Sequence, residues 1–389
     1  MDKTSRTVIS GSSACVVGLL VALLVVLPRT PAGAAASAAP SSYAIKGAGY
    51  GHGVGLSQYG AKVAAEEGRT HSHILSFYYP GTSVERTSGS IRVQISAETR
   101  DTLVIASRPG LSVRSVSSAA TWPLARAGAT MWRITPSADD TVSRVWAFVD
   151  RRWVLVRNIT GDAEFVAGSL RLVLTSGSVV YRGNLRSARV GTGRDVVNVV
   201  PLDSYLRGVV PREMPALWHQ QALRAQAVAA RTYAVHERET TDRGHFDVYD
   251  TTRSQVYGGA GFEHDRTDKA IADTRGEIRT YGGTAAFTQF SSSNGGWTVA
   301  GSRPYLRAKQ DPYDPVMTWT TSVSAARIRA AFPAVGAVQA VRVVARDGRG
   351  LYGGRATSVR ITGSTRTIDV DGSLFRSRLG LRSTLFRFS

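Results

Sequence analysis

The hydrophobic positions of this chain follow two different patterns. From Ser90 to Val200 the sequence passes through short stretches such as IRVQI, LVIA, VWAFV and LRLVL, which Gly, Asp, Ser or Pro separate. Such stretches are typical of β-strands joined by turns. From about His219 to Arg238 the chain is rich in Ala, and positions 223, 227, 230 and 234 share one face of a helix. This region predicts one long helix whose small side chains pack close to a sheet.

The flanking segments complete the expected fold. Residues 41–87 are glycine-rich and then helical, and Pro80 and Gly81 supply a turn. Residues 249–299 predict short strands and polar turns, and AVQAVRVVA and TSVRITG predict two strands near the end of the chain. We therefore expect an α+β fold with mixed or antiparallel β-structure, in which one long Ala-rich helix forms a substrate cleft.

The chain begins like an exported protein. Basic residues at Lys3 and Arg6 precede an apolar run from Ala14 to Leu27 and an Ala, Gly, Ser and Pro segment, which is the layout of a secretory signal peptide. The run is shorter than the roughly 20 residues of a membrane-spanning helix, although an uncleaved anchor stays open as an alternative. The only cysteine, Cys15, lies inside this run, so the exported chain folds without disulfides. We expect a protein outside the cytoplasm.

Arginine dominates the charge. The 48 Lys and Arg residues against 29 Asp and Glu give a formal net charge of +19, and lysine occurs at only five positions. Codon bias in a GC-rich genome explains this composition as well as function does. A basic exported protein is still drawn to anionic wall polymers, whereas nucleic acid is excluded because the basic residues are dispersed and carry no RNA-binding signature. The glycines at 47–55 fit no dinucleotide-binding register, and no cofactor is expected.

The most informative carboxylate is Glu213, at the mouth of the Ala-rich helix. The sequence predicts that Val209 and Val210 extend from a strand, that prolines hold the backbone on either side, and that Trp218 supplies an apolar wall. Desolvation in such a place raises the pKa of a carboxyl and keeps a fraction protonated near neutral pH. By its chemistry alone, Glu213 suits either a general acid or a helix-start carboxylate that interacts with the helix dipole.

Other polar residues are weaker candidates. Arg231 could face the same cleft, where a cation would lower the pKa of Glu213, so the better role for Arg231 is to bind substrate or to steady the ionised carboxylate. His52 either lines the cleft and contacts a ligand or hydrogen-bonds its own backbone. Residues 291–294 lack the elbow of a serine nucleophile and suit polar contacts to a ligand, or a turn.

Several motifs resemble those of one protein family. The run VVNVVPLDSYLRGVVPREMPALW, followed by ALRAQAVAARTYA, is similar to the core signature of the SpoIID/LytB family, named for stage II sporulation protein D and an amidase enhancer. Further resemblances are SQVYGG at 254–259, SSSNGG at 291–296, PYLRA at 304–308, FRSRLGLRSTLF at 375–386, and GHGVGLSQYGAK at 51–62 with ILSFYYPGT at 74–82. The GHG motif usually follows the catalytic region. Here it is permuted to the amino-terminal side, from which it can dock in the same place because domain termini often lie close together.

The resemblance implies a peptidoglycan lytic transglycosylase. In this family the Glu of the EMP motif, here Glu213, is the catalytic acid and base, and the Arg of AARTYA, here Arg231, is implicated in activity. Such an enzyme uses no water nucleophile, so a second carboxylate is not required. The resemblance also implies substrate-binding roles at other motif positions, namely His52, Gln58, Ser292, Ser293, Asn294, Tyr305 and Arg307.

No metal site is expected. Some family members bind zinc through Cys and His near the strand that ends in Q-V-Y-G. The stretch here, YDTTRSQVYGG, has no cysteine, so His245 has no thiolate partner. His71 and His73 have no acidic companion ligand in the sequence and are expected at the surface.

The expected domains are a signal peptide at 1–39, a glycine-rich segment at 40–87, and a SpoIID/LytB-like catalytic domain at 88–389 with a β-rich part (88–195) and a core (196–389). The expected activity is cleavage of the MurNAc–GlcNAc bond in peptidoglycan glycan strands, which leaves 1,6-anhydromuramyl ends. The alternative is a noncatalytic wall-binding protein that recruits or stimulates an N-acetylmuramoyl-L-alanine amidase, which would then be its partner.

Overall fold

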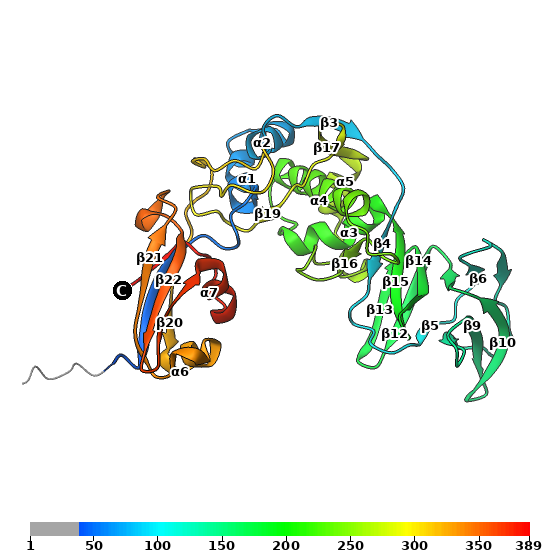
Figure 1. Cartoon of the computed structure of the whole chain (residues 1–389). Helices are drawn as coiled ribbons and strands as arrows, with labels where there is room; N and C mark the ends of the chain where they lie inside the picture. Colours follow the sequence, from blue (N-terminus) through cyan, green and yellow to red (C-terminus); the bar gives the residue numbers. More distant parts are fainter. Residues whose placement is uncertain (1–38) are drawn as a thin grey trace, which may run out of the picture. The chain divides into compact units, whose positions relative to one another are not determined.

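The fold is described from a computed structural model, and the described residues are 39–389 (Figure 1). The remaining positions, 1–38, hold Cys15 and all but the last residue of the expected signal peptide, so that prediction lies outside the described residues. Residues 40–389 form one compact unit. No helix in the described part of the chain is long and apolar enough to cross a membrane.

Two sheets make up the β-rich part. One has seven strands in the order β16-β4-β15-β14-β11-β6-β7, antiparallel except for β16 with β4. The other has six antiparallel strands in the order β10-β9-β8-β5-β12-β13. The bounds are β4 Ser90–Gln94, β5 Leu103–Ala106, β6 Ser112–Ser115, β7 Thr121–Pro123, β8 Met131–Pro136, β9 Val142–Val149, β10 Arg152–Thr160, β11 Ala163–Val166, β12 Ser169–Leu174, β13 Gly177–Arg182, β14 Asn184–Val190, β15 Gly193–Pro201 and β16 Val248–Tyr249. The β-structure predicted for this region is confirmed.

The two sheets share one hydrophobic core. Trp132 and Ile134 of β8, Phe165 of β11 and Val196 of β15 are all buried in it. In β8 these residues alternate with more exposed ones, as in a strand with one face covered. Burial of the apolar face stabilises the fold by about 25 cal/mol per Å² removed from water. The core thereby fixes β15, and β15 leads directly into the helix that carries Glu213.

A second core surrounds the Ala-rich helix, α4 Gln220–Thr240, which confirms the predicted helix. The side chain of His219 caps it by accepting a hydrogen bond from the backbone N–H of Gln221. Four helices contact it, namely α1 Gln58–Glu66, α2 His71–Tyr78, α3 Leu202–Glu213 and α5 Asp265–Asp273. It also contacts β17 of the sheet β18-β17-β3, formed by β3 Ser83–Arg86, β17 Glu277–Tyr281 and β18 Thr284–Ala285. Its buried alanines are short, so these neighbours can pack closely against it.

Two predictions for this region are wrong. Residues 249–299 hold more than short strands and turns, because α5 forms there, with His264 accepting a hydrogen bond from the backbone N–H of Arg266. Val209 and Val210 belong to α3, and not to a strand. Glu213 is the last residue of α3, so it does not stand at a helix start. The favourable dipole interaction considered for it is excluded, because the carboxyl end of a helix disfavours a negative charge.

The end of the chain joins its first described strand. β1 Ser42–Ala48 lies between β20 Thr318–Ser324 and β24 Phe386–Phe388, and Ile45 is paired with both Thr321 and Phe388. The predicted strands AVQAVRVVA and TSVRITG correspond to β21 and β22 of a further sheet. That sheet and two helices have the bounds β21 Val338–Arg346, β22 Ala356–Gly363, β23 Thr367–Asp371, α6 Ala325–Ala331 and α7 Gly372–Leu379.

The alternating glycines place the amino-terminal segment directly against residues 289–295. β2 Leu56–Ser57 runs parallel to β19 Phe290–Ser291. Gly51 has φ +115°, and a Cβ there would lie 2.5 Å from the Cβ of Ser291. A Cβ at Gly55 would collide with the carbonyl oxygen of Gln289. Only glycine fits such contacts, so the glycine pattern serves the close approach of two backbones.

Candidate active site

A cavity of about 500 Å³ opens where these segments meet. Its walls come from residues 50–58, from Glu213, from Tyr233 of α4 with residues 252–256, and from residues 289–292. Glu213 is the only carboxylate among the residues that line it. Most of the other lining residues are polar as well, and a concave site with convergent polar side chains around one carboxyl is the arrangement expected of a binding or catalytic site.

Glu213 is half-buried at the end of α3. The backbone N–H of Val256 donates a hydrogen bond to its Oε1 at 3.0 Å. Burial raises the pKa of Glu213, and it outweighs the hydrogen bonds from Val256 and Gln58 and the charge of Arg212, which lower it. Glu213 therefore holds its proton to a higher pH than an ordinary glutamic acid.

Gln58 connects the glycine-rich segment to Glu213. It is the first residue of α1, and Ser57 caps this helix by accepting a hydrogen bond from the N–H of Gly60 at 3.1 Å. Only 6% of Gln58 is exposed. Its Nε2 donates to Oε1 of Gln226 on α4 at 3.4 Å, and its side chain also hydrogen-bonds Glu213. Through Gln58, the motif GHGVGLSQYGAK thus contacts Glu213, the carboxyl predicted from the sequence to be functional.

His52 lies at the mouth of the cavity and is exposed to solvent. Its Nδ1 accepts a hydrogen bond from the N–H of Val54 at 2.9 Å, so the local backbone contact considered for it is present along with the cavity position. Desolvation of the ring, and then the charges of Arg376 and Arg355, lower the pKa of His52 to about 4, although a hydrogen bond with the backbone of Phe290 opposes the shift. The imidazole is therefore neutral at neutral pH, with its proton on Nε2 because Nδ1 is an acceptor.

Residues 291–294, which we call the serine loop, both line the cavity and support its wall from behind. Ser292 lines the cavity, and its carbonyl accepts a hydrogen bond from the N–H of Tyr59 at 3.0 Å. Ser293 and Asn294 do not line it. The Oγ of Ser293 donates to Asp314 at 2.9 Å, and Nδ2 of Asn294 donates to Asp311 at 2.6 Å. These two buried residues hold the loop in place from behind, and any effect on a ligand would be indirect.

The structure does not bring Arg231 to the cavity. Its side chain is fully buried, with Nε 2.9 Å from Oδ1 of Asp203 and two further hydrogen bonds to the carbonyls of Glu277 and Ile271. These contacts tie α4 to α3, α5 and β17. A direct role in catalysis therefore stays a prediction without geometric support, whereas a role in holding the helices together follows from the contacts.

Tyr305 and Arg307 also lie elsewhere. The hydroxyl of Tyr305 accepts a hydrogen bond from the N–H of Phe287 at 2.6 Å, and the residue is 3% exposed. Arg307 is exposed and donates from Nε to the carbonyl of Pro304 at 3.3 Å. Neither residue lines the cavity of Glu213.

Several lining residues were not singled out from the sequence, among them Tyr50, Tyr233 and Arg253. Tyr50 is 54% exposed, and the guanidinium of Arg382 lies 5.8 Å from its ring centre. The guanidinium of Arg253 stacks 3.7 Å from the ring centre of Tyr249. Tyr233 belongs to the AARTYA motif and Arg253 directly precedes SQVYGG, so the motifs themselves carried the signal for these two.

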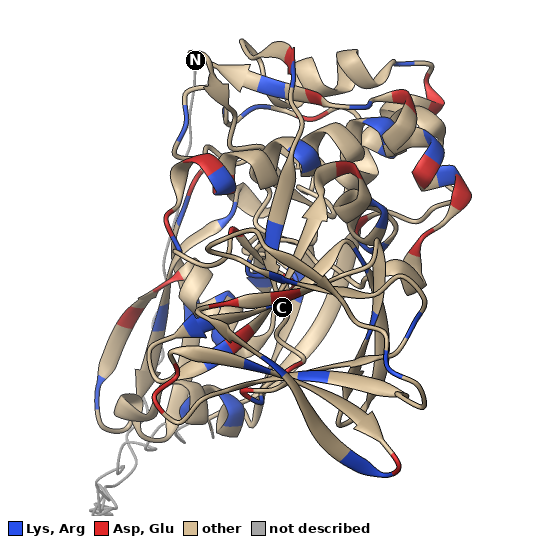
Figure 2. Ribbon diagram, turned by 90° about the vertical axis from the view of Figure 1, so that its right-hand side faces the viewer, with Lys and Arg blue, Asp and Glu red and all other residues tan. Residues whose placement is uncertain are grey.

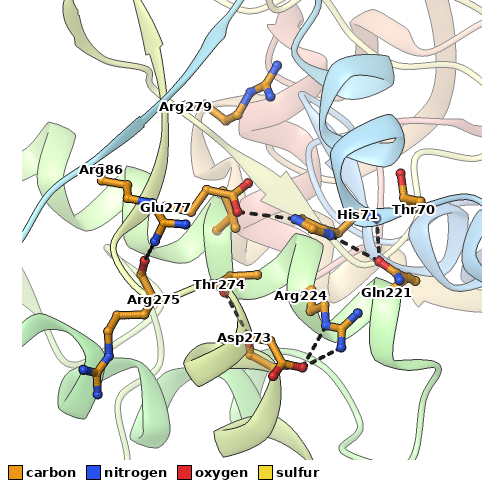
Figure 3. Close-up of polar contacts among 12 residues, drawn as sticks. Thr70, His71, Arg86, Gln221, Arg224, Asp273, Thr274, Arg275, Glu277 and Arg279 are labelled. Atoms are coloured by element: carbon orange, nitrogen blue, oxygen red, sulfur yellow. Dashed lines mark hydrogen bonds and ion pairs between the residues drawn. The ribbon is translucent and has the colours of Figure 1, made fainter.

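The histidines considered as metal ligands make other contacts. Figure 3 shows His71 between two helices and a strand, with Nδ1 3.2 Å from Oε1 of Gln221 and Nε2 3.4 Å from Oε2 of Glu277. His71 is half-buried, so its expected surface position is wrong, whereas His73 is exposed as expected. Nε2 of His245 lies 2.7 Å from Asp195. Within residues 39–389 no group of three His, Cys, Asp or Glu side chains is arranged to hold a metal ion.

Comparisons with known proteins show which curated proteins are similar to this chain. Among curated proteins, the amidase enhancer of Bacillus subtilis (strain 168) is 45% identical over 125 residues, which cover 31% of this chain and 17% of that protein. Stage II sporulation protein D of the same strain is 32% identical over 145 residues, or 32% of this chain and 42% of that protein. Stage II sporulation protein D of Bacillus amyloliquefaciens is 28% identical over 223 residues, or 51% of this chain and 62% of that protein.

The matched region of this chain therefore spans less than two thirds of each of these relatives. Residues 190–281 match the family model described as SpoIID, stage II sporulation protein. The match runs from β14 to β17 and contains α3, α4 and Glu213. The resemblance to the SpoIID family is confirmed for residues 190–281, which match its domain model.

Proposed function

We propose that this protein is an exported lytic transglycosylase that remodels peptidoglycan by cleaving the bond between N-acetylmuramic acid and N-acetylglucosamine. One observation carries the proposal. Glu213, a carboxyl with a raised pKa, is the single acidic residue that lines the cavity. The family match around it supports the same reading.

The chemistry needs one group that gives and then takes a proton. Protonated Glu213 donates to the glycosidic oxygen, so the bond from C1 of the muramyl sugar breaks and the other sugar leaves with a hydroxyl. The carboxylate then accepts the proton of the muramyl 6-hydroxyl as that oxygen bonds to C1. The result is a 1,6-anhydro ring, and Glu213 is protonated again. No water enters, so a second carboxylate, which an ordinary glycosidase requires, has no task here.

The neighbours of Glu213 suit this cycle. Burial favours the protonated form at the start. Once the proton has left, the Val256 N–H and Gln58 stabilise the carboxylate through hydrogen bonds. Neutral His52 and the exposed ring of Tyr50 offer a hydrogen-bond donor and a stacking surface for sugar at the mouth of the cavity.

A second candidate has its own support, because the relative at 45% identity is named an amidase enhancer. Under this alternative the cavity binds glycan without cleaving it, and the protein recruits or stimulates a separate cell-wall amidase. Peptidoglycan strands are the ligand in both cases. Both also require export, as the beginning of the sequence predicts.

Product analysis separates the two. The purified exported chain and its Glu213→Gln variant are incubated with peptidoglycan and with peptide-free glycan strands, and the products are identified by mass spectrometry. Anhydromuramyl products from the unmodified protein alone would establish the transglycosylase. If neither protein releases anything, while both stimulate an added amidase equally, the enhancer function replaces it.

A further inference from the structure

The six-stranded sheet has an outward face that the proposed reaction does not use. The pairing of the strands brings several side chains of this face next to one another. Arg133 of β8 is paired with Trp146 of β9, and Phe148 of β9 is paired with Trp153 of β10. Facing residues of an antiparallel pair lie on the same side of a sheet. The neighbours Trp132 and Ala147 are buried in the core, so these four side chains point away from it.

Arg144 and Arg171 extend this face. Arg144 is two residues before Trp146 on β9, and it is exposed. On β12, Leu172 is paired with the core residue Ile105, so Arg171 next to it points outward. We call the set Arg133, Arg144, Trp146, Phe148, Trp153 and Arg171 the arginine–tryptophan face.

The charge on this face has one sign. The six strands of the sheet contain no aspartate or glutamate. Among the described residues, no carboxylate lies within 4 Å of the guanidinium of Arg133, Arg144 or Arg171. The seven-stranded sheet differs, because its buried Glu164 pairs with both Arg114 and Arg186. Figure 2 turns the side with β9 and β10 toward the viewer and colours the basic and acidic residues.

Aromatic rings lie among these cations. The guanidinium of Arg133 is 4.4 Å from the ring centre of Trp153 and 5.0 Å from that of Trp146. Its buried Nε has no hydrogen-bond partner among the described residues. The rings of Phe148 and Trp153 are 5.0 Å apart, and all three aromatic side chains are half-buried. The face thus offers flat apolar surface and cations side by side, with Arg133 held between the two indole rings.

We propose that the arginine–tryptophan face is a second glycan-binding site, and that it holds an acidic polysaccharide strand. Arginine pairs with carboxylates through charge-assisted hydrogen bonds, and indole rings stack against the apolar faces of sugars. A polymer of glycerol phosphate has no sugar ring in its backbone to stack, so the aromatic residues favour the glycan. The inference rests on the proposed function for its ligand, because a peptidoglycan strand with free muramyl carboxylates meets both requirements.

A shallow hollow continues from the edge of the face. It is lined by Arg108 and Arg126 along residues 107–110 and 124–130, and a smaller hollow beside it is lined by Arg108 and Arg171. No Asp or Glu lines either one. The shared residue Arg108 therefore links the two hollows and extends the cationic surface beyond Arg171.

The test measures binding in the Glu213→Gln background, so cleavage does not enter the result. The probe is a series of peptide-free glycan strands with free muramyl carboxylates. The variant Arg144→Gln with Arg171→Gln removes two exposed cations of the face. Its control, Arg329→Gln with Arg342→Gln, removes two exposed cations elsewhere and leaves the same net charge. We expect about a tenfold weaker Kd for the first pair and no change for the second.

Three outcomes would overturn the inference. Equal weakening by both pairs would mean a general effect of net charge. Equal affinity for neutral chitooligosaccharides of the same length would remove the role of the carboxylates. Tighter binding of poly(glycerol phosphate) than of glycan would assign the face to a different polymer. Trp153→Ala gives an independent check, since it should weaken glycan binding while thermal unfolding confirms that the variant is folded. If this binding test fails, the proposed transglycosylase activity is not affected, because product analysis of the unmodified protein tests that activity separately.

Discussion

The backbone N–H of Val256 lies 3.0 Å from Oε1 of Glu213 and donates a hydrogen bond to it. The two residues are 43 positions apart, and the segment between them contains the whole of α4. This bond, with the hydrogen bond from Gln58, fixes the carboxyl at the wall of the cavity. It favours the ionised form, whereas burial favours the protonated form, and burial prevails. The acid and base tasks proposed for Glu213 both draw on this balance.

The first prediction concerns the pH dependence of cleavage. The reaction starts from protonated Glu213, and its pKa is raised by burial. Activity should therefore persist above the ordinary pKa of 4.5 and fall as pH rises through the raised value. Release of anhydromuramyl products measured from pH 4 to 9 checks this. A rate that climbs steadily with pH across neutrality would contradict the acid role.

The second prediction concerns stability. A carboxyl whose pKa is raised by folding makes the fold less stable as pH rises above its unfolded pKa, because the folded state must bury the charge. Glu213→Gln removes this cost and keeps an oxygen for the Val256 N–H. The variant should melt at a higher temperature than the unmodified protein at pH 8, and the difference should shrink toward pH 4. Equal melting temperatures throughout would show that the carboxylate carries no burial cost.

The third prediction separates structure from catalysis at Arg231. Arg231→Lys keeps the charge, but a single ammonium does not reproduce three contacts to Asp203, Glu277 and Ile271. We expect a loss of about 3 kcal/mol in the free energy of unfolding, measured with urea. At a temperature where the variant stays folded, turnover should be close to normal. A stable variant without turnover would instead support the catalytic role that the family resemblance implies.

The fourth prediction concerns the alternating glycines. Gly51→Ala forces a Cβ against Ser291 in a left-handed backbone, and should cost roughly 1–3 kcal/mol and most of the glycan binding. Gly68→Ala is the matched control, because Gly68 also has a positive φ of +84° but no atom lies within 4 Å of its Cβ position. The control should lose some stability and keep binding. Equal loss of binding in both would mean that backbone strain alone is responsible.

The fifth prediction concerns His71 and Glu277. The hydrogen bond between them raises the pKa of His71 and lowers that of Glu277. The histidine contribution is complete below pH 6.5 and is lost as pH rises through the raised pKa. The glutamate contribution is complete above pH 4.5 and is lost as pH falls through the lowered pKa. His71→Gln should therefore lower the melting temperature most between pH 4.5 and pH 6.5, where both contributions are complete. A constant difference across pH would exclude the ion pair as the cause.

Local sequence patterns predicted the elements that they encode. The strands of the β-rich part and α4 follow from apolar periodicity. The short helix α5 was missed because its sequence, DRTDKAIAD, is polar except for a few residues that pack under α4. The burial of Arg231 could not be read from helix periodicity, since its partners Asp203 and Glu277 come from distant segments that meet only in the folded chain.

The residues of the site were predicted only in part. Glu213 was identified from its neighbours in the sequence, but the reasoning placed it at the start of a helix rather than at the end. Gln58 and His52 lie more than 150 positions before Glu213, and only their motif linked them to it. Tyr305 and Arg307 belong to PYLRA, which aligns more loosely with the family, and they lie away from the cavity. A residue of a family motif can thus serve the fold without contacting the site.

The pairing of β1 with β24 sets the order in which this protein can become active. Ile45 and Phe388 are neighbours in one sheet although almost the whole chain separates them. Contacts between such distant residues form late in folding, because a very long loop must close first. β1 leads directly into the glycine-rich segment that lines the cavity. A chain exported from its amino terminus, as we propose, would thus lack a complete cavity until β24 has crossed the membrane. Activity against the wall would then begin only after β24 has paired with β1.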